Sequence, residues 1–218
     1  MSISTENFIK TIYKMHMRSN QDTKPGSIAR TLMFSNAAAT DMAKKLAAKD
    51  LIKYEKYKAL SLTDKGQELA LKVLRKHRLW ETFLHEVLHM DLHEIHTEAE
   101  MLEHQTSDYL ANKLSEFLNH PKYDPHGDPI PDQNLNLPAV TDAINLSGAQ
   151  EGKYIISRLF SSDKEFFSFC EANQIKIDTQ IVVKKQYTNN KMTAIEIQGK
   201  EIILPSEFAE VIYVKPIN

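Results

Sequence analysis

The hydrophobic pattern of this chain changes its period along the sequence, and this change limits the fold more than any other feature. As far as about residue 118, apolar residues recur at the spacing of an amphipathic α-helix. After residue 138 they fall in short runs such as Tyr154-Ile155-Ile156, which are typical of β-strands. The 120–138 stretch between these parts contains five prolines and one glycine, and we expect it to be an ordered loop or linker. The pattern therefore predicts a mainly α fold with a small β domain.

The first sixty residues have the pattern of a winged helix-turn-helix. Two short helices are predicted over 27–32 and 37–49, joined by a tight connection, with Ser35 or Asn36 as the cap of the second. Residues 51–62 then predict two short strands around a polar tip. A hairpin directly after a helix-turn-helix is a wing, so this part of the chain is expected to bind DNA.

Longer helices surround this motif. One is predicted over 5–18, one from about residue 64 to about residue 90, and one from residue 93 to about residue 118. In the last third, strand-like runs lie at 154–156, 181–183, 194–197 and 202–204, with a short helix at 163–172. Short strands at this density suggest a small β-barrel.

The net charge of −2 hides an uneven distribution of charge. Residues 1–75 contain 14 Lys and Arg against 7 Asp and Glu, which gives +7. Residues 76–140 contain 4 against 12, which gives −8, and residues 141–218 contain 9 against 10, which gives −1. A basic first third suits a polyanion such as DNA, and an acidic middle suits cations. The alternative is that both segments are ordinary solvated helix faces.

The second helix of the helix-turn-helix would face the major groove with its first turns. Small side chains allow close approach to thymine methyl groups, Asn and Thr hydrogen-bond base edges, and lysines contact phosphates. The alternative is that the alanines are only good helix formers and the lysines only solvated. The candidate DNA-contacting residues are Ser35, Asn36, Ala37, Ala38, Thr40, Lys44, Lys45 and Lys56.

Eight of the nine histidines lie between His77 and His126, among the acidic residues. His77 and Glu81 are four apart and share one helix face. His96, Glu100, Glu103 and His104, at offsets of 0, 4, 7 and 8, share a face of the next helix. Imidazoles and carboxylates without a thiolate suit Mn2+, Fe2+, Co2+ or Zn2+. The single cysteine, Cys170, excludes a disulfide or a multi-cysteine zinc site within one chain, and we interpret it as a core residue.

A competing motif is His85-Glu86-Val87-Leu88-His89, which on a helix could bind zinc with Glu86 as the general base of a peptidase. His93 or Glu103 would be the third ligand. The motif lies near the predicted end of its helix, and no extended third-ligand signature follows it, so this enzyme is the alternative rather than the main hypothesis. A metal-storing or metal-sensing protein that does not read DNA is a further alternative.

The N-terminal residues and the hydropathy of the sequence indicate where in the cell the protein is found. The N-terminal residues show no basic region followed by an apolar run, so they do not form a secretory signal. No apolar stretch approaches the roughly 20 residues of a membrane span. We expect a soluble cytoplasmic protein with no membrane partner.

Several strings resemble the diphtheria toxin repressor family, which includes iron-sensing and manganese-sensing branches. These strings are TENFIKTIY, SIARTLMFSNAAATDMAKKL, LSLTDKG, RKHRLWETFL, HTEAEMLEHQTSD and HPKYDPHGDPIP. The resemblance implies a winged helix-turn-helix over 1–73, a helical metal-binding and dimerisation domain over 74–138 and an SH3-like (FeoA-like) barrel over 139–218. It also implies a homodimer whose metal-bound form represses metal-homeostasis genes by binding a double-stranded DNA operator.

The resemblance divides the histidines and carboxylates into two metal sites. The ancillary site would be His77, Glu81 and His96, completed from the C-terminal domain by Asp163 or Glu165. The primary site would be Glu100, Glu103 and His104 with Asn7 from the first helix.

Two positions near the primary site bear on which metal binds. At Lys10 the manganese branch typically has an acid, and a protonated lysine cannot coordinate a metal. At Glu100 the iron branch typically has a cysteine, whereas a carboxylate is a hard ligand that favours Mn2+. We therefore expect Mn2+, with Fe2+ as the alternative and Zn2+ or Co2+ as substitutes in vitro.

Overall fold

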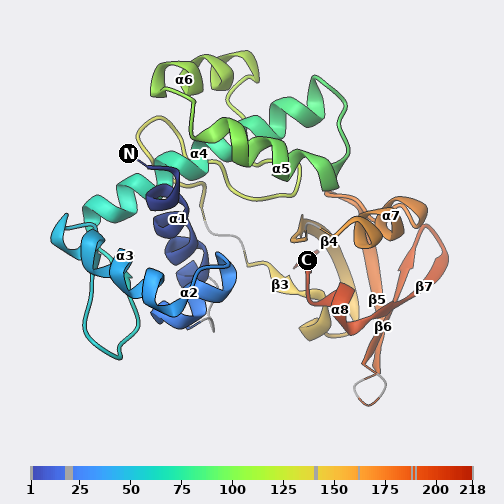
Figure 1. The fold of residues 1–218 in the computed structure, drawn as a ribbon. Helices are drawn as coiled ribbons and strands as arrows, with labels where there is room; N and C mark the ends of the chain where they lie inside the picture. Colours follow the sequence, from blue (N-terminus) through green and yellow to red (C-terminus); the bar gives the residue numbers. More distant parts are fainter. Residues whose placement is uncertain are drawn as a thin grey trace.

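The structure is a computed structural model that describes residues 2–17, 22–139, 142–161, 163–187, 189 and 191–217. Helices predominate as far as residue 117 and strands predominate after residue 143, as the change in hydrophobic period predicts (Figure 1). Helix α4 runs from the N-terminal part into the central helical part, while the β domain lies to one side (Figure 1). Among the described residues, none of the helices is long and apolar enough to cross a membrane.

The N-terminal part is the predicted winged helix-turn-helix. It contains α1 (Ile3–Met17), α2 (Pro25–Thr31), α3 (Asn36–Ala48) and a hairpin of β1 (Ile52–Lys53) and β2 (Ser61–Leu62). The expected last residue of the first helix, Arg18, lies outside the described residues. Ser35 caps α3 by accepting a hydrogen bond from the amide of Ala38 at 3.1 Å, as predicted. Phe8, Ile9 and Ile12 are fully buried, so α1 is the centre of this domain's core.

Helix α4 (Asp64–Glu86) starts against the wing and ends in the central part. Thr63 caps it by accepting from the amide of Gly66 at 3.1 Å. A Cβ at Gly66 would lie 1.9 Å from the carbonyl oxygen of Leu51, so the close approach of α4 to the wing requires glycine.

The prediction of a single helix over 93–118 is wrong. The structure has α5 (Leu92–Glu103) and α6 (Asp108–Phe117), separated by a short turn. Ser107 caps α6 by accepting from the amide of Leu110, and Thr106 is held between Trp80 Nε1 and the carbonyl of Leu102. These hydrogen bonds give the backbone an alternative to a continuous helix. The apolar residues keep a helical spacing across the break, so the apolar pattern alone predicts one helix.

The C-terminal part is a six-stranded antiparallel sheet with short helices. Its strand order is β3-β8-β4-β5-β6-β7. Ile156, Ile195, Leu204 and Val214 are buried in its core, consistent with the expected SH3-like barrel. The elements are β3 (Ile144–Asn145), the 3-10 helix η1 (Leu146–Gly148), β4 (Gly152–Leu159), α7 (Lys164–Ala172), β5 (Gln180–Tyr187), β6 (Met192–Ile197), β7 (Lys200–Pro205), α8 (Ser206–Ala209) and β8 (Ile212–Pro216).

The proline-rich loop after α6 attaches the β domain to the helices. The amide of Leu159 donates to the carbonyl of His126 at 2.8 Å, and Arg158 forms an ion pair with Asp128. Gly127 has φ of +85°, and a Cβ there would lie 2.2 Å from the carbonyl oxygen of Ser157. The loop is therefore in close backbone contact with β4.

Candidate metal centre

Side chains from α1, α4 and α5 form one connected polar network in the interior. His77 of α4 lies at its middle, with Nε2 3.1 Å from Glu81 and Nδ1 2.6 Å from Glu103. The spacing of four along α4 puts His77 and Glu81 on the face that meets α5. The structure thus brings together the two helix faces that the sequence predicts.

The expected ancillary residues meet at Glu81. Its Oε1 lies 3.0 Å from His96 Nδ1 and 3.1 Å from His77 Nε2, and Glu81 and His77 are both buried. Burial raises the pKa of Glu81, but His77 and His96 outweigh it and hold that pKa well below its ordinary value. Burial lowers the pKa of His77, but Glu81 and Glu103 outweigh it and raise the pKa. Each of the two groups favours the charged form of the other.

The expected primary residues also converge. Glu100, Glu103 and His104 can each offer a ligand atom, and these atoms lie within 4.8 Å of one another. Glu103 is buried, with Oε1 3.3 Å from His104 Nε2. Helix α1 reaches the same place, because Glu6 Oε2 lies 2.6 Å from His104 Nδ1. The sequence prediction did not include Glu6.

Lys10 of α1 enters this cluster directly. Its Nζ lies 2.6 Å from Glu100 Oε2 and 2.5 Å from Glu103 Oε1. Burial raises the pKa of Glu100, but Lys10 outweighs it and lowers that pKa. Lys10 therefore supplies the positive charge that these two carboxylates need.

Three buried polar atoms of the cluster, and the amide oxygen of Asn7 on α1, have no hydrogen-bond partner among the described residues. They are Asn7 Oδ1, His77 Nδ1, Glu103 Oε2 and His104 Nε2. The 2.6 Å approach of His77 to Glu103 lacks hydrogen-bond geometry. Buried polar atoms are normally satisfied, so such a group needs an explanation. A divalent cation would use these oxygen and nitrogen lone pairs together, and the residues present fit one.

A further acidic group lies beside Glu81 and was missed by sequence reasoning. Glu81, Asp124 and His126 are all buried, and each can offer a ligand atom within 4.8 Å of the others. Burial, then Asp128 and Glu81, raise the pKa of Asp124 well above its ordinary value, and burial lowers the pKa of His126. Both residues lie in the string DPHGD of the proline-rich loop, which has no periodicity that could assign them to a site.

Asp163 and Glu165 lie at the start of α7, on the surface. Asp163 caps that helix by accepting from the amide of Glu165 at 2.7 Å. Within the described part of the chain, the structure records no hydrogen bond or ion pair from either residue to His77, Glu81 or His96. Their role as an ancillary ligand stays a prediction.

The His85–His89 motif is interrupted by the end of α4 at Glu86. His89 has φ of +56° and is exposed, and His85 Nδ1 lies 2.9 Å from the carbonyl oxygen of Met90. His85 and His89 therefore do not share a helix face, and the peptidase alternative loses its geometric basis.

The candidate DNA-contacting residues lie on the outer side of α3 and on the wing. All are exposed except Thr40, which is half-buried and donates to the carbonyl of Asn36 at 2.8 Å. Lys45 pairs with Asp41 at 2.8 Å on this surface, and Lys56 lies 4.9 Å from the ring centre of Tyr57. The exposed face fits the predicted contact with DNA.

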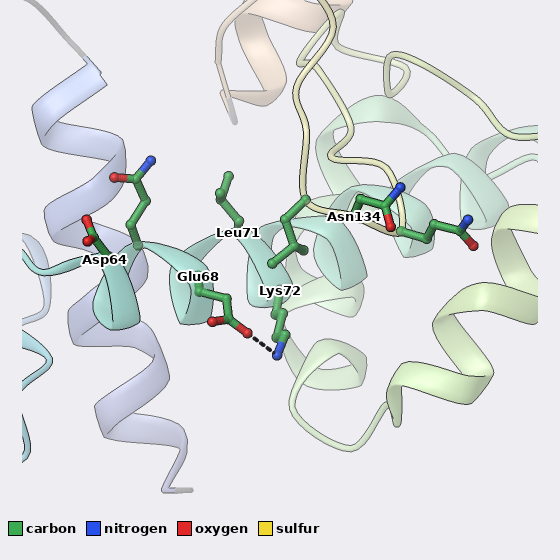
Figure 2. Close-up of a pocket in the computed structure, with 8 residues that line it drawn as sticks. Asp64, Glu68, Leu71, Lys72 and Asn134 are labelled. Atoms are coloured by element: carbon green, nitrogen blue, oxygen red, sulfur yellow. Dashed lines mark hydrogen bonds and ion pairs between the residues drawn. The ribbon is translucent and has the colours of Figure 1, made fainter.

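A groove between α4 and the loop around Asn134 is separate from the metal centre (Figure 2). Asp64, Glu68 and Lys72 line its α4 side, and Glu68 and Lys72 pair with each other at 2.6 Å (Figure 2). Since Glu68 is paired with Lys72 and Asp64 is the only other charged group of the lining, we assign the groove no role.

Three family models match successive parts of the chain. They describe an iron-dependent repressor N-terminal DNA-binding domain (residues 1–60), an iron-dependent repressor metal-binding and dimerisation domain (residues 63–132) and a FeoA domain (residues 144–216). These ranges follow the three parts of the structure.

Individual proteins match over nearly the whole chain. The diphtheria toxin repressor of Corynebacterium efficiens is 26% identical over 99% of this chain and 96% of its own length. A manganese-dependent transcriptional repressor in complex with manganese has a TM-score of 0.91 and 29% identity, with 98% of this chain and 100% of that one covered. The manganese regulator SloR has a TM-score of 0.79 and 33% identity, with 98% of each chain covered.

Proposed function

The chain belongs to the family of iron-dependent repressors that includes the diphtheria toxin repressor, and we propose that Mn2+ is the ion that activates it. It is a metal-dependent, DNA-binding transcriptional repressor of metal homeostasis and not an enzyme. Because it acts on operator DNA, we propose the cytoplasm as its location.

The observation that carries the metal proposal is the convergence of Glu100, Glu103 and His104, whose possible ligand atoms lie within 4.8 Å of one another where α1 contacts α5. Among the described residues, Glu103 Oε2, His104 Nε2 and Asn7 Oδ1 are buried and form no hydrogen bond, although Glu103 Oε2 lies 2.6 Å from His77 Nδ1. Glu100, Glu103, His104 and Asn7 would hold the ion. A bound divalent ion would supply two positive charges that join α1 of the DNA-binding domain to α5 of the metal-binding domain.

The donor set supports Mn2+ over softer ions. Three of the four proposed ligands offer oxygen, and the only cysteine, Cys170, is buried in the β domain. Hard oxygen donors suit Mn2+, whereas thiolates select softer ions. Fe2+ is the alternative physiological ion, and Zn2+ or Co2+ would substitute in vitro because affinity for such ligands follows the Irving–Williams order.

The proposed ligands link metal binding to DNA reading through α1. Asn7 stands next to Phe8 and Ile9, which are fully buried in the core that also contains Ala39 and Leu46 of α3. Because cores are close-packed, a displacement of α1 at Asn7 would therefore shift α3 as well. The ion stabilises one arrangement of α1 over others only to the extent that it binds that arrangement more tightly.

A second ion is proposed at the ancillary group around Glu81. The expected ligands His77 and His96 lie 3.1 and 3.0 Å from Glu81 Oε1, and Asp163 or Glu165 was expected to complete the set. The burial of Asp124 and His126 beside Glu81 adds donors from the loop that contacts the β domain. His96 and His126 are replaced in separate variants to test which of them binds the second ion. Only the loss of a ligand should weaken the binding of that ion.

The protein acts as a homodimer on double-stranded DNA. The central domain matches a dimerisation model, and α6 exposes Tyr109, Leu110 and Phe117. Large apolar side chains exposed together mark interaction surfaces. Two subunits would place two α3 helices on one pseudo-palindromic operator.

The proposal is tested by titrating Mn2+, Fe2+ and Zn2+ against DNA binding. The duplex is selected from a random-sequence pool with each ion separately, and Glu103→Gln is compared with Glu94→Gln, an exposed α5 control. We expect Mn2+ to support binding by the wild type and by Glu94→Gln but not by Glu103→Gln. If only Zn2+ supports binding, the manganese assignment is wrong.

A further inference from the structure

Lys10 is an unusual residue to find inside a metal centre. It is 4% exposed, and its Nζ lies between Glu100 Oε2 at 2.6 Å and Glu103 Oε1 at 2.5 Å. Lysine is almost never buried unless it is paired. Both partners are proposed metal ligands, so the ammonium and a divalent ion would draw on the same two carboxylates.

We propose that Lys10 is a tethered competitor for the primary site: its ammonium neutralises Glu100 and Glu103 in the metal-free protein, and it raises the metal concentration at which the site fills. This inference rests on the proposed function, because it assumes that Glu100 and Glu103 are ligands. It adds a residue that sets the metal threshold without being a ligand.

The charges of the group explain the competition. One ammonium against two carboxylates leaves a net charge of −1, whereas a divalent ion against the same two leaves zero. If both cations were present, they would lie against the same carboxylates and repel each other, so the binding of one weakens the binding of the other. An ammonium has three donors and no acceptor, so Lys10 cannot join the coordination shell while protonated.

The placement of Lys10 on α1 strengthens the argument. Lys10 follows Asn7 by three residues and Glu6 by four, so both lie next to Lys10 on the surface of the helix. Glu6 contacts His104, and Lys10 contacts Glu100 and Glu103, so this surface is in contact with α5 over two successive turns. In the metal-free protein the ammonium of Lys10 therefore links α1 to α5 through the same two carboxylates that a metal ion would bind.

The test is Mn2+ binding to the full-length chain by isothermal titration calorimetry, with no DNA present. Lys10→Met removes the charge and keeps much of the side-chain volume. We expect its Mn2+ affinity to rise about tenfold or more, the effect that one neighbouring charge has on a buried ionisable group. Lys10→Arg keeps the charge and is expected to bind about as wild type does. Lys76→Met, which breaks the Lys76–Asp108 pair outside the cluster, is the control and should also be unchanged.

Thermal unfolding supplies a second readout. Without metal, Lys10→Met should melt at a lower temperature than wild type, because two carboxylates lose their counter-ion. Saturating Mn2+ should raise its melting temperature by more than it raises that of wild type. If Lys10→Met does not fold, Lys10→Gln is measured instead, since the amide keeps a hydrogen-bond donor without the charge.

The outcomes separate this inference from the proposed function. Equal or weaker Mn2+ binding by Lys10→Met, with wild-type binding lost in Glu103→Gln, overturns the competitor role and leaves the metal site in place. If Glu103→Gln binds Mn2+ as wild type does, the proposed site itself is wrong.

Discussion

Nδ1 of His104, the residue directly after α5, lies 2.6 Å from Oε2 of Glu6 on α1. An ionised carboxylate accepts hydrogen bonds, so this contact puts the ring proton on Nδ1 and leaves the lone pair on Nε2. Nε2 is the atom that faces Glu103. In the proposed metal site, Glu6 would therefore position His104 for coordination.

Replacing Glu6 with Gln should weaken Mn2+ binding about 10- to 100-fold, the usual cost of losing a residue that orients a metal ligand. The amide keeps the shape but no longer fixes the ring tautomer. Calorimetric titration of the full chain measures the change. Glu68→Gln, which alters an exposed ion pair of α4, is the matched control and should bind as wild type does. Unchanged affinity in Glu6→Gln would show that His104 is oriented by other means.

The lysines of α3 should contribute affinity for DNA but little sequence preference. Lys44→Ala and Lys45→Ala each remove one exposed charge, so each should weaken binding to all duplexes and reduce the slope of log affinity against log salt by about one. Fluorescence anisotropy at several salt concentrations checks this. Lys113→Ala removes an exposed lysine of α6 and should leave the slope as it is. A change of preferred sequence with an unchanged slope would contradict the phosphate role.

The turn between α5 and α6 should depend on the cap at Ser107. Its hydroxyl accepts from the amide of Leu110 at 3.1 Å, and loss of such a cap costs about 1 kcal/mol. Ser107→Ala should therefore lower the free energy of unfolding by about that amount in urea denaturation. Ser168→Ala, at an exposed position of α7, should cost much less. Equal losses in the two variants would show that the cap does not hold the turn.

Cys170 should be unreactive in the folded protein. Burial raises the pKa of its thiol to about 12 from an ordinary value of 9.0. Since the folded protein holds this proton more tightly than the unfolded chain, the free energy of unfolding should fall as pH rises from 9.0 toward about 12. Alkylation by iodoacetamide at about pH 9 should be slow without denaturant and fast with it. Fast alkylation of the native protein would contradict the burial.

Much of the fold could be predicted from the sequence because its signals are local. Apolar periodicity and caps predicted α1 to α4, the two strands of the wing, and β4 to β7 of the β domain to within a few residues. The break after Glu103 was missed because hydrogen bonds of Thr106 and Ser107 decide it, while the apolar spacing continues into α6. The two-residue strand β3 and the last strand β8 were not among the predicted strands.

The candidate site shows the same division between local and distant signals. His77, Glu81, His96 and the residues of α5 could be grouped from helical spacing. Asp124 and His126 could not, because the loop that carries them folds back onto α4 from about forty residues away and has no period. The contact of Lys10 with Glu100 spans ninety positions and buries a lysine, which a sequence pattern does not predict.

The most direct test of the central claim is anomalous scattering from crystals of the full chain grown with Mn2+ as the only added divalent ion. The account predicts an anomalous peak within coordination distance of Glu103 and His104, with Glu100 and the amide oxygen of Asn7 completing the protein ligands and Lys10 turned away from the carboxylates. The absence of a manganese peak between Glu103 and His104, in crystals where manganese is bound elsewhere on the chain, would contradict it.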